Sequence, residues 1–310
     1  MSKRLMILGD SGFLGRCVQR VASSEGWQTY GASLSKGFDL RSKGALERVT
    51  SEFKPSVIVN CAAHVGGLAY GKGRQARILV DNMQMILESF EFLSRNPHIR
   101  MINPIANCAY PGDLAEFREE NFWSGSIHPS VLGYGGARRF SVLASQAFRE
   151  QYDVDVVDVS LPNLYGPGDH LDPVRAHALG GMVYRFVKAQ REHKEEVIIW
   201  GSGMPVREWL FAEDAARALI SAASTNTELR FINVGCGEGI SVAELAKLIA
   251  SIVGYEGKLT YDTSMADGAK EKRMIAENAS EALSWQPQVS LAVGLELTVA
   301  DVRNRLDEVR

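Results

Sequence analysis

The stretch Gly9-Asp10-Ser11-Gly12-Phe13-Leu14-Gly15 decides the fold class of this chain. It follows a short apolar run at 5–8 and leads into an amphipathic segment that begins near Phe13. Glycines at this spacing allow a tight turn after a strand, and they let backbone N–H groups at the start of the next helix approach a pyrophosphate. We therefore predict a dinucleotide site that includes Gly9, Gly12, Phe13, Leu14 and Gly15.

Short β-rich runs alternate with helix-length amphipathic stretches through the first half of the chain. The predicted strand–helix pairs are 5–8 with 13–25, 57–59 with 74–94, and 100–102 with 134–151. Such alternation is typical of βαβ units around a parallel sheet. Further strands are expected at 28–32, 154–160, 197–200 and 231–234. The predicted fold is α/β, with a Rossmann-type doubly wound parallel sheet.

Prolines and glycines become frequent after residue 165. Pro167, Gly168, Gly180 and Gly181 lie close together, which indicates a long loop that enters a different region. We expect residues 1–165 to form the dinucleotide-binding domain, joined by a returning strand at 231–234. Residues 166–310 are expected to form mainly a smaller α/β region that binds substrate, ending in an amphipathic surface helix at 291–310.

The composition of the 310 residues excludes several classes of protein. With 45% hydrophobic and 23% charged residues and a net charge of -3, the chain has no broad basic field, so we expect no nucleic-acid partner. No apolar stretch is long enough to span a bilayer. The cysteines, which are Cys17, Cys61, Cys108 and Cys236, have no C-x-x-C spacing that would indicate zinc or a disulfide framework. A cytoplasmic protein without metal or membrane anchor is expected.

The predicted second strand ends without the acid that grips a ribose 2′-hydroxyl. Its end reads Ser33-Leu34-Ser35-Lys36, and Arg41 follows. Cations at this place favour a 2′-phosphate, so we predict NADP over NAD. The alternative, in which Lys36 or Arg41 is a solvated charge on a loop without a cofactor contact, fits the sequence equally well. The other predicted cofactor contacts are Ser33, Asp39 and Leu40 near the adenosine, and Ala62 and Ala63 in the groove after the third strand.

Five further segments, in this order behind the glycine turn, resemble the GDP-L-fucose synthase family of extended short-chain dehydrogenases (NAD-dependent epimerases/dehydratases). They are Ala62-Ala63-His64-Val65-Gly66-Gly67, Asn107-Cys108-Ala109-Tyr110-Pro111, Tyr134-x-x-x-Arg138, Asn163-Leu164-Tyr165-Gly166-Pro167 and Trp200-Gly201-Ser202-Gly203-Met204-Pro205-Val206-Arg207-Glu208. The resemblance implies an enzyme that inverts the two carbons beside the ketone of a GDP-4-keto-6-deoxy sugar and then reduces the ketone with NADPH. It also implies a homodimer, for which 74–94 and 134–151 are the candidate helices.

Inversion beside a ketone needs a base on one face of the sugar and an acid on the other, because the carbanion is delocalised as an enolate. Cys108 matches the family's cysteine, and His177 falls where the family places its histidine. Their ordinary pKa values, about 8.5 and about 6.5, lie within reach of neutral pH. His128 and His170 are rival histidines in the same region. Without the motif, Cys108 would be interpreted as a small buried apolar residue.

The reductive residues of this superfamily are a Ser or Thr, a Tyr, and a Lys four residues after the Tyr. Here only Tyr134 is kept, because Ala106 takes the hydroxyl position and Arg138 the lysine position. Asn107 is expected to be a poor substitute, since neighbouring side chains on a strand point to opposite faces. Arg138 lies one helical turn beyond Tyr134, where its charge lowers the phenol pKa and holds the cofactor ribose, whereas Arg139 lies further round the helix.

The substrate contacts implied by the resemblance are Val65 and Gly66 for the hexose, Arg185 and Arg207 for the diphosphate, and Asn163, Trp200 and Arg175 as further contacts. Our leading hypothesis is a 3,5-epimerase of a GDP-4-keto-6-deoxy sugar or a related nucleotide sugar, with or without NADPH-dependent 4-ketoreduction. One alternative is a reductase or dehydratase on another nucleotide sugar. The other is an NADP-binding sensor or scaffold without catalysis, motivated by the loss of the serine and lysine.

Overall fold

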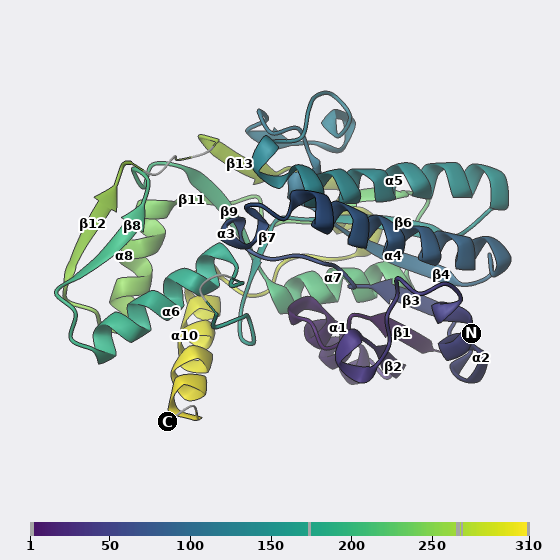
Figure 1. The fold of residues 1–310 in the computed structure, drawn as a ribbon, viewed down its shortest axis with the longest axis horizontal. Coiled ribbons are helices and arrows are strands. Elements are labelled where there is room, and N and C mark those ends of the chain that lie inside the picture. Colours follow the sequence, from purple (N-terminus) through teal and green to yellow (C-terminus); the bar gives the residue numbers. More distant parts are fainter. Residues whose placement is uncertain (1–2, 173–174, 265–266, 268, 309–310) are drawn as a thin grey trace.

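The computed structural model describes residues 3–172, 175–264, 267 and 269–308. Its larger part is a parallel sheet covered by helices on both faces, and a smaller α/β part adjoins the sheet on the side where the chain ends (Figure 1). In the described part of the chain, no helix combines the length and apolarity needed to cross a membrane.

The main sheet is parallel, and its described strands lie in the order β10-β6-β4-β3-β1-β2. The strands are β1 (Arg4–Leu8), β2 (Gln28–Ala32), β3 (Val57–Asn60), β4 (Arg100–Ala106), β6 (Val156–Leu161) and β10 (Phe231–Asn233). The predicted α/β fold with a doubly wound sheet is confirmed. The strand order reverses between β1 and β3, and open α/β sheets bind ligands outside the carboxyl ends of the strands at such a switch point.

Alternating side chains of the sheet enter two separate cores. Leu5 and Ile7 of β1 pack with α1 (Phe13–Ser24) and α7 (Ala212–Ser224), whereas Met6 and Leu8 face the side covered by α2, α4 and α5. Figure 1 shows α4 and α5 on one face of the sheet and α1 and α7 on the other. The helices of the second face are α2 (Ala45–Phe53), α4 (Gln75–Arg95) and α5 (Leu132–Tyr152).

The smaller part has a core of its own, around Tyr165, Phe186 and Trp209. Its strands are β5 (Glu116–Phe117), β7 (Asn163–Tyr165), β8 (Glu196–Trp200), β9 (Val206–Phe211), β11 (Gly239–Ser241), β12 (Lys258–Asp262) and β13 (Glu271–Met274). Its helices are α6 (Ala178–Arg191), α8 (Val242–Val253) and α10 (Leu291–Glu308), while α3 (Leu68–Gly71) and α9 (Glu277–Leu283) are short. Short 3-10 turns occur at Leu34–Lys36, Asn107–Ala109, Glu119–Asn121 and Pro129–Val131.

The chain crosses between the two parts more than once. The predicted returning strand is present as β10, which pairs with β6, and α7 also returns to pack on α1. A division near residue 165 therefore stays a prediction, since residues beyond it contribute both a strand and a helix to the main sheet. The predicted final helix is observed from Leu291 to Glu308, and residues 309–310 lie outside the described part.

Candidate active site

The glycine turn joins the carboxyl ends of three strands. Gly9 has a φ of +75°, and its amide donates a hydrogen bond of 2.7 Å to the carbonyl of Ala32 at the end of β2. A Cβ on Gly9 would lie 2.8 Å from backbone atoms of Ala62, in the loop after β3. Only glycine allows this contact at this φ. The predicted cofactor residues of the turn and of the loop after β3 therefore lie together at the switch point, beside the start of α1.

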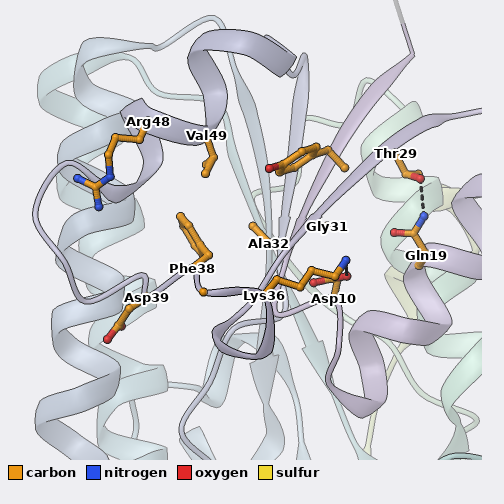
Figure 2. A pocket seen from close by; sticks show the side chains of 12 residues that line it. Asp10, Gln19, Thr29, Gly31, Ala32, Lys36, Phe38, Asp39, Arg48 and Val49 are labelled. Carbon is orange, nitrogen blue, oxygen red and sulfur yellow. Dashed lines mark hydrogen bonds and ion pairs between the residues drawn. The ribbon is translucent and has the colours of Figure 1, made fainter.

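A cavity of about 660 Å³ opens beside this turn, against β2 and α2 (Figure 2). Ala32, Phe38 and Val49 give it apolar walls, while Asp10 and Lys36 line it with charge. A cavity of this size and mixed lining fits an adenosine moiety, as ligand sites commonly have about 300–1,000 Å³. The residues present thus fit the predicted dinucleotide.

The predicted contacts at the adenosine differ in what they face. Lys36 lines the cavity, with its Nζ 2.6 Å from the carboxylate of Asp10. Arg41 is instead held by Asp39 at 2.7 Å and by Asp81 at 3.3 Å, which leaves Lys36 as the better placed cation. Asp39 lines the cavity, and its contact with the adenosine stays a prediction.

Two predicted residues nearby are less accessible. The side chain of Leu40 is buried in the core beneath α2 and α4, so a contact of this residue with the adenine stays a prediction that would fall to its backbone. Ser33 is buried, and its hydroxyl lies 3.3 Å from that of Ser35.

Cys108 lies where β4 gives way to a short turn. β4 ends at Ala106, and Asn107–Ala109 form a turn of 3-10 helix. The prediction that Asn107 and Ala106 point to opposite faces as neighbours on one strand is therefore wrong, because the backbone leaves the strand before Asn107. Ala106 does stand at the strand end, without a hydroxyl group to offer a ketone.

Tyr134 and Arg138 pair on one face of α5, as their spacing predicts. The guanidinium of Arg138 lies 5.2 Å from the centroid of the Tyr134 ring and donates a hydrogen bond of 3.2 Å to the carbonyl of Ala62. Arg138 is only 3% exposed, and its buried Nε has no hydrogen-bond partner among the residues that the structure describes. Arg139, by contrast, donates to the carbonyls of Ala109 and Gly125 and so fixes the loop that follows Cys108.

The pKa values in this cluster are set mainly by burial. Burial raises the pKa of Cys108 to about 11, opposed by the charges of Arg138 and Lys272. The ordinary pKa of a cysteine lies within reach of neutral pH, but burial moves the pKa of Cys108 away from it in the ligand-free structure, and the two cations offset the effect of burial only in part. Burial also raises the pKa of Tyr134, although Arg138 acts against it, so the phenol remains protonated at neutral pH.

His177 caps the start of α6 and faces the glycine turn. Its Nδ1 lies 2.8 Å from a carboxylate oxygen of Asp169, and its ring centroid lies 5.7 Å from that of Phe13. Burial would lower the pKa of His177, but the hydrogen bond and the charge of Asp169 outweigh it and raise the pKa. Of the two rivals, His128 bonds the hydroxyl of Ser130 at an exposed turn, and burial lowers the pKa of His170.

The predicted diphosphate contacts lie in the smaller part. Arg207 on β9 pairs in register with Lys272 on β13, and burial lowers the pKa of both side chains. The guanidinium of Arg185 lies 5.6 Å from the ring of Trp200, which is 60% exposed. Lys272 is close enough to interact by charge with both Arg207 and Cys108.

Of the remaining predicted substrate contacts, Asn163, Gly66 and Arg175 contact other residues of the protein, whereas Val65 is exposed. The amide of Asn163 donates 3.0 Å to the carbonyl of Glu208, which holds β7 to β9. A Cβ on Gly66 would lie 2.6 Å from the ring of Tyr70, so this glycine makes room for a side chain of the protein itself. Val65 is exposed, and the guanidinium of Arg175 lies 5.6 Å from the Tyr70 ring.

A family model described as "NAD dependent epimerase/dehydratase family" matches residues 5–235. A GDP-L-fucose synthase of Sinorhizobium fredii is 30% identical to this chain over 294 residues, which cover 94% of this chain and 93% of the relative. The chain belongs to the NAD-dependent epimerase/dehydratase family. The predicted resemblance to this extended short-chain dehydrogenase group is confirmed.

Two solved structures share the fold of this epimerase/dehydratase family member. A GDP-6-OMe-4-keto-L-xylo-heptose reductase from Campylobacter jejuni superposes with a TM-score of 0.89 at 19% identity, covering 98% of this chain and 99% of that chain. A GDP-L-fucose synthetase from Naegleria fowleri bound to NADP gives a TM-score of 0.85 at 22% identity, covering 98% and 95%.

Sequence reasoning did not single out Asp169 and Lys272, which the structure places beside His177 and Arg207. Asp169 stands between Gly168 and His170 in a loop that also contains Asp172. The sequence therefore shows acidic residues near His177, but it does not show which of them contacts the histidine. Lys272 is far from Arg207 in sequence, and only the pairing of β13 with β9 brings them together.

Proposed function

We propose that this protein catalyses the 3,5-epimerisation of a GDP-linked 4-keto-6-deoxy sugar or a related GDP sugar. It is a nucleotide-sugar epimerase/reductase of the extended short-chain dehydrogenase type. The observation that carries the proposal is the placement of two groups that can exchange protons, with Cys108 just after the carboxyl end of β4 and His177 against the start of α1. Cys108 lies beside Tyr134 and Arg138, and His177 lies beside the glycine turn, held by a buried carboxylate.

Cys108 and His177 supply the acid and the base for inversion. A C–H bond beside the ketone breaks, its proton passes to one of the two groups, and the electron pair enters an enolate. The other group then returns a proton to the opposite face of the same carbon. Asp169 supports this exchange because its carboxylate orients the imidazole and leaves Nε2 to face the reacting carbon.

Tyr134 stabilises the enolate oxygen. Its phenol stays protonated, so it donates a hydrogen bond to the oxygen on which negative charge develops, and the buried Arg138 adds positive charge nearby. This role needs no hydride, and it accounts for the presence of Tyr134 beside the unusual Arg138. Reduction of the ketone is the slower activity, because Ala106 lacks the hydroxyl that would share the oxygen with Tyr134.

The GDP moiety is bound by the cations of the smaller part. Arg207 and Lys272 stand side by side on paired strands, where two partly desolvated charges suit a diphosphate. Trp200 exposes its ring above Arg185 and offers a stacking surface for the guanine base. This assignment is supported by the GDP-sugar names of the relatives.

NADP(H) is the proposed cofactor, and when bound it supplies the hydride for ketone reduction. Lys36 lines the adenosine cavity, β2 ends without an acidic residue, and a fold neighbour is described as bound to NADP. Arg138, with its buried unpartnered Nε, would hold the ribose of the nicotinamide half.

The assay that tests the proposal uses GDP-4-keto-6-deoxymannose and NADPH in deuterated water. We expect deuterium at both carbons flanking the ketone, detected by mass spectrometry and NMR, with slow loss of absorbance at 340 nm. Deuterium uptake without NADPH would establish epimerisation apart from reduction. If neither signal appears with any GDP-4-keto sugar, the epimerase proposal fails and the sensor or scaffold alternative gains support.

We further propose a homodimer in a reducing cytoplasm. Val80 and Leu87 of α4 and Leu143 of α5 are exposed apolar side chains, and a second copy of the chain would cover them. The cysteines are all unpaired thiols, as a reducing compartment requires. Sedimentation analysis should give a dimer mass for the wild type and a monomer for Leu87→Asp. A wild-type monomer would contradict the dimer.

A further inference from the structure

Asp10, the second residue of the glycine turn, places a carboxylate in the adenosine cavity. The residue is 8% exposed, yet it lines the cavity (Figure 2). Its Oδ2 lies 2.6 Å from Nζ of Lys36, while Oδ1 is buried and has no hydrogen-bond partner among the described residues. An unsatisfied buried carboxylate oxygen is costly for the protein, so this one calls for an explanation.

The strand beside Asp10 is shaped to admit this carboxylate. A Cβ on Gly31 would lie 2.2 Å from Oδ2 of Asp10, so any larger residue at position 31 would displace the acid. Gly31 precedes the last residue of β2, which is the part of the fold where dinucleotide-binding proteins place the acid that accepts the ribose 2′-hydroxyl. Asp10 therefore brings an acid to that place from the glycine turn instead of from the strand end.

The two charges act in opposite directions on the ribose substituent. A 2′-phosphate carries about -1.5 to -2 charges at neutral pH, so it is attracted by Lys36 and repelled by Asp10. A 2′-hydroxyl carries no charge, so Asp10 does not repel it and the carboxylate can accept a hydrogen bond from it. Arg41 does not alter this balance, since Asp39 and Asp81 hold it.

We propose that the Asp10–Lys36 ion pair is the specificity-determining element for the cofactor, in which Asp10 favours NAD(H) and Lys36 favours NADP(H). The wild-type protein then binds both cofactors with only a modest preference for NADP(H). The inference rests on the proposed use of a nicotinamide dinucleotide, and it concerns neither the sugar nor the epimerisation.

Calorimetric titration with NADPH and with NADH, without any sugar, tests the pair. Asp10→Asn keeps the shape of the side chain and removes its charge, and we expect the NADPH:NADH affinity ratio to rise about tenfold. Lys36→Gln should lower the same ratio about tenfold. Lys43→Gln, which removes an exposed charge outside the cavity, is the matched control and should leave the ratio unchanged.

Opposite shifts of the ratio in the two variants support the proposal. An Asp10→Asn ratio within twofold of wild type, or an equal loss of both cofactors, would overturn it, since the carboxylate would then have only a structural role. Should Asp10→Asn fail to fold, the Lys36→Gln variant still tests the proposal, because Lys36 is half-exposed. An unchanged NADPH:NADH affinity ratio in Lys36→Gln would overturn the proposal. Failure of the epimerase assay with intact cofactor binding would leave this inference standing.

Discussion

The carboxylate of Asp169 lies 2.8 Å from Nδ1 of His177, and the C-terminal helix fixes the segment that carries this carboxylate. Arg305 of α10 donates 2.7 Å to the carbonyl of Asp169, and Asp301 of α10 accepts 2.9 Å from the amide of Gly168. The last helix of the chain therefore holds the carboxylate that orients a proposed catalytic group.

Asp169→Asn should shift the pH dependence of epimerisation to lower pH. Asp169 raises the pKa of His177, so removing its charge lowers that pKa, and the limb of the kcat profile governed by His177 moves down with it. We expect kcat at the optimum to fall about tenfold or more, because the imidazole also loses its orientation. Asp153→Asn, at an exposed left-handed position where Asn is equally suited, is the control. An unchanged profile in Asp169→Asn would contradict the positioning role.

The thiol of Cys108 should alkylate slowly at neutral pH in the free protein. Its pKa of about 11 leaves little thiolate at pH 7, so the rate measured by iodoacetamide labelling and peptide mass spectrometry should rise up to strongly alkaline pH. Lys272→Met should slow labelling at pH 9 about threefold or more, since a cation that lowers this pKa is lost. The exposed Lys270→Met is the control. Equal rates in all three proteins would show that Lys272 does not act on Cys108.

Ala106→Ser should accelerate reduction without changing epimerisation. The added hydroxyl stands at the end of β4, where it shares the ketone oxygen with Tyr134, and we expect NADPH consumption to rise about tenfold. Deuterium uptake serves as the internal reference and should stay within twofold. If consumption of NADPH does not rise, the missing hydroxyl is not what limits reduction.

Asp158→Asn should stabilise the protein at alkaline pH and much less at pH 5. Burial raises the pKa of Asp158 to about 7, whereas the unfolded chain ionises near pH 3.9. The folded state therefore keeps a proton that the unfolded state releases, and wild-type stability falls as the pH rises from 4 to 7 by up to about 1.4 kcal/mol per pH unit. The Asp158→Asn variant does not lose stability in this way. The difference between its Tm and the wild-type Tm, measured by calorimetry, should therefore grow to several degrees at pH 8.

The control for this prediction is Asp155→Asn, a partly exposed residue just before β6 that pairs with Arg100 and Arg230. Its effect on Tm should not grow with pH. A constant Tm difference between Asp158→Asn and wild type from pH 5 to pH 8 would show that Asp158 is ionised throughout this range.

Local patterns were enough to predict the frame of this protein. The glycine turn, the strand at 28–32 and the start of α1 at Phe13 agree with the structure, because each depends on neighbours within one turn or strand. The spacing of Tyr134 and Arg138 likewise predicted their contact, since four residues of helix place two side chains on one face. The prediction about Asn107 was also local, and it was wrong because β4 ends at Ala106, before Asn107 and Cys108.

The sequence by itself determined the βαβ order, the family and the residue types available for proton transfer. Tertiary structure alone decided their environments: Asp169 beside His177, Lys272 opposite Arg207, and Asp10 against Gly31. These pairs are separated along the chain and meet only when strands and helices pack. Burial follows from the same packing, and it is burial that raises the pKa of Cys108 far above the value that its residue type suggests.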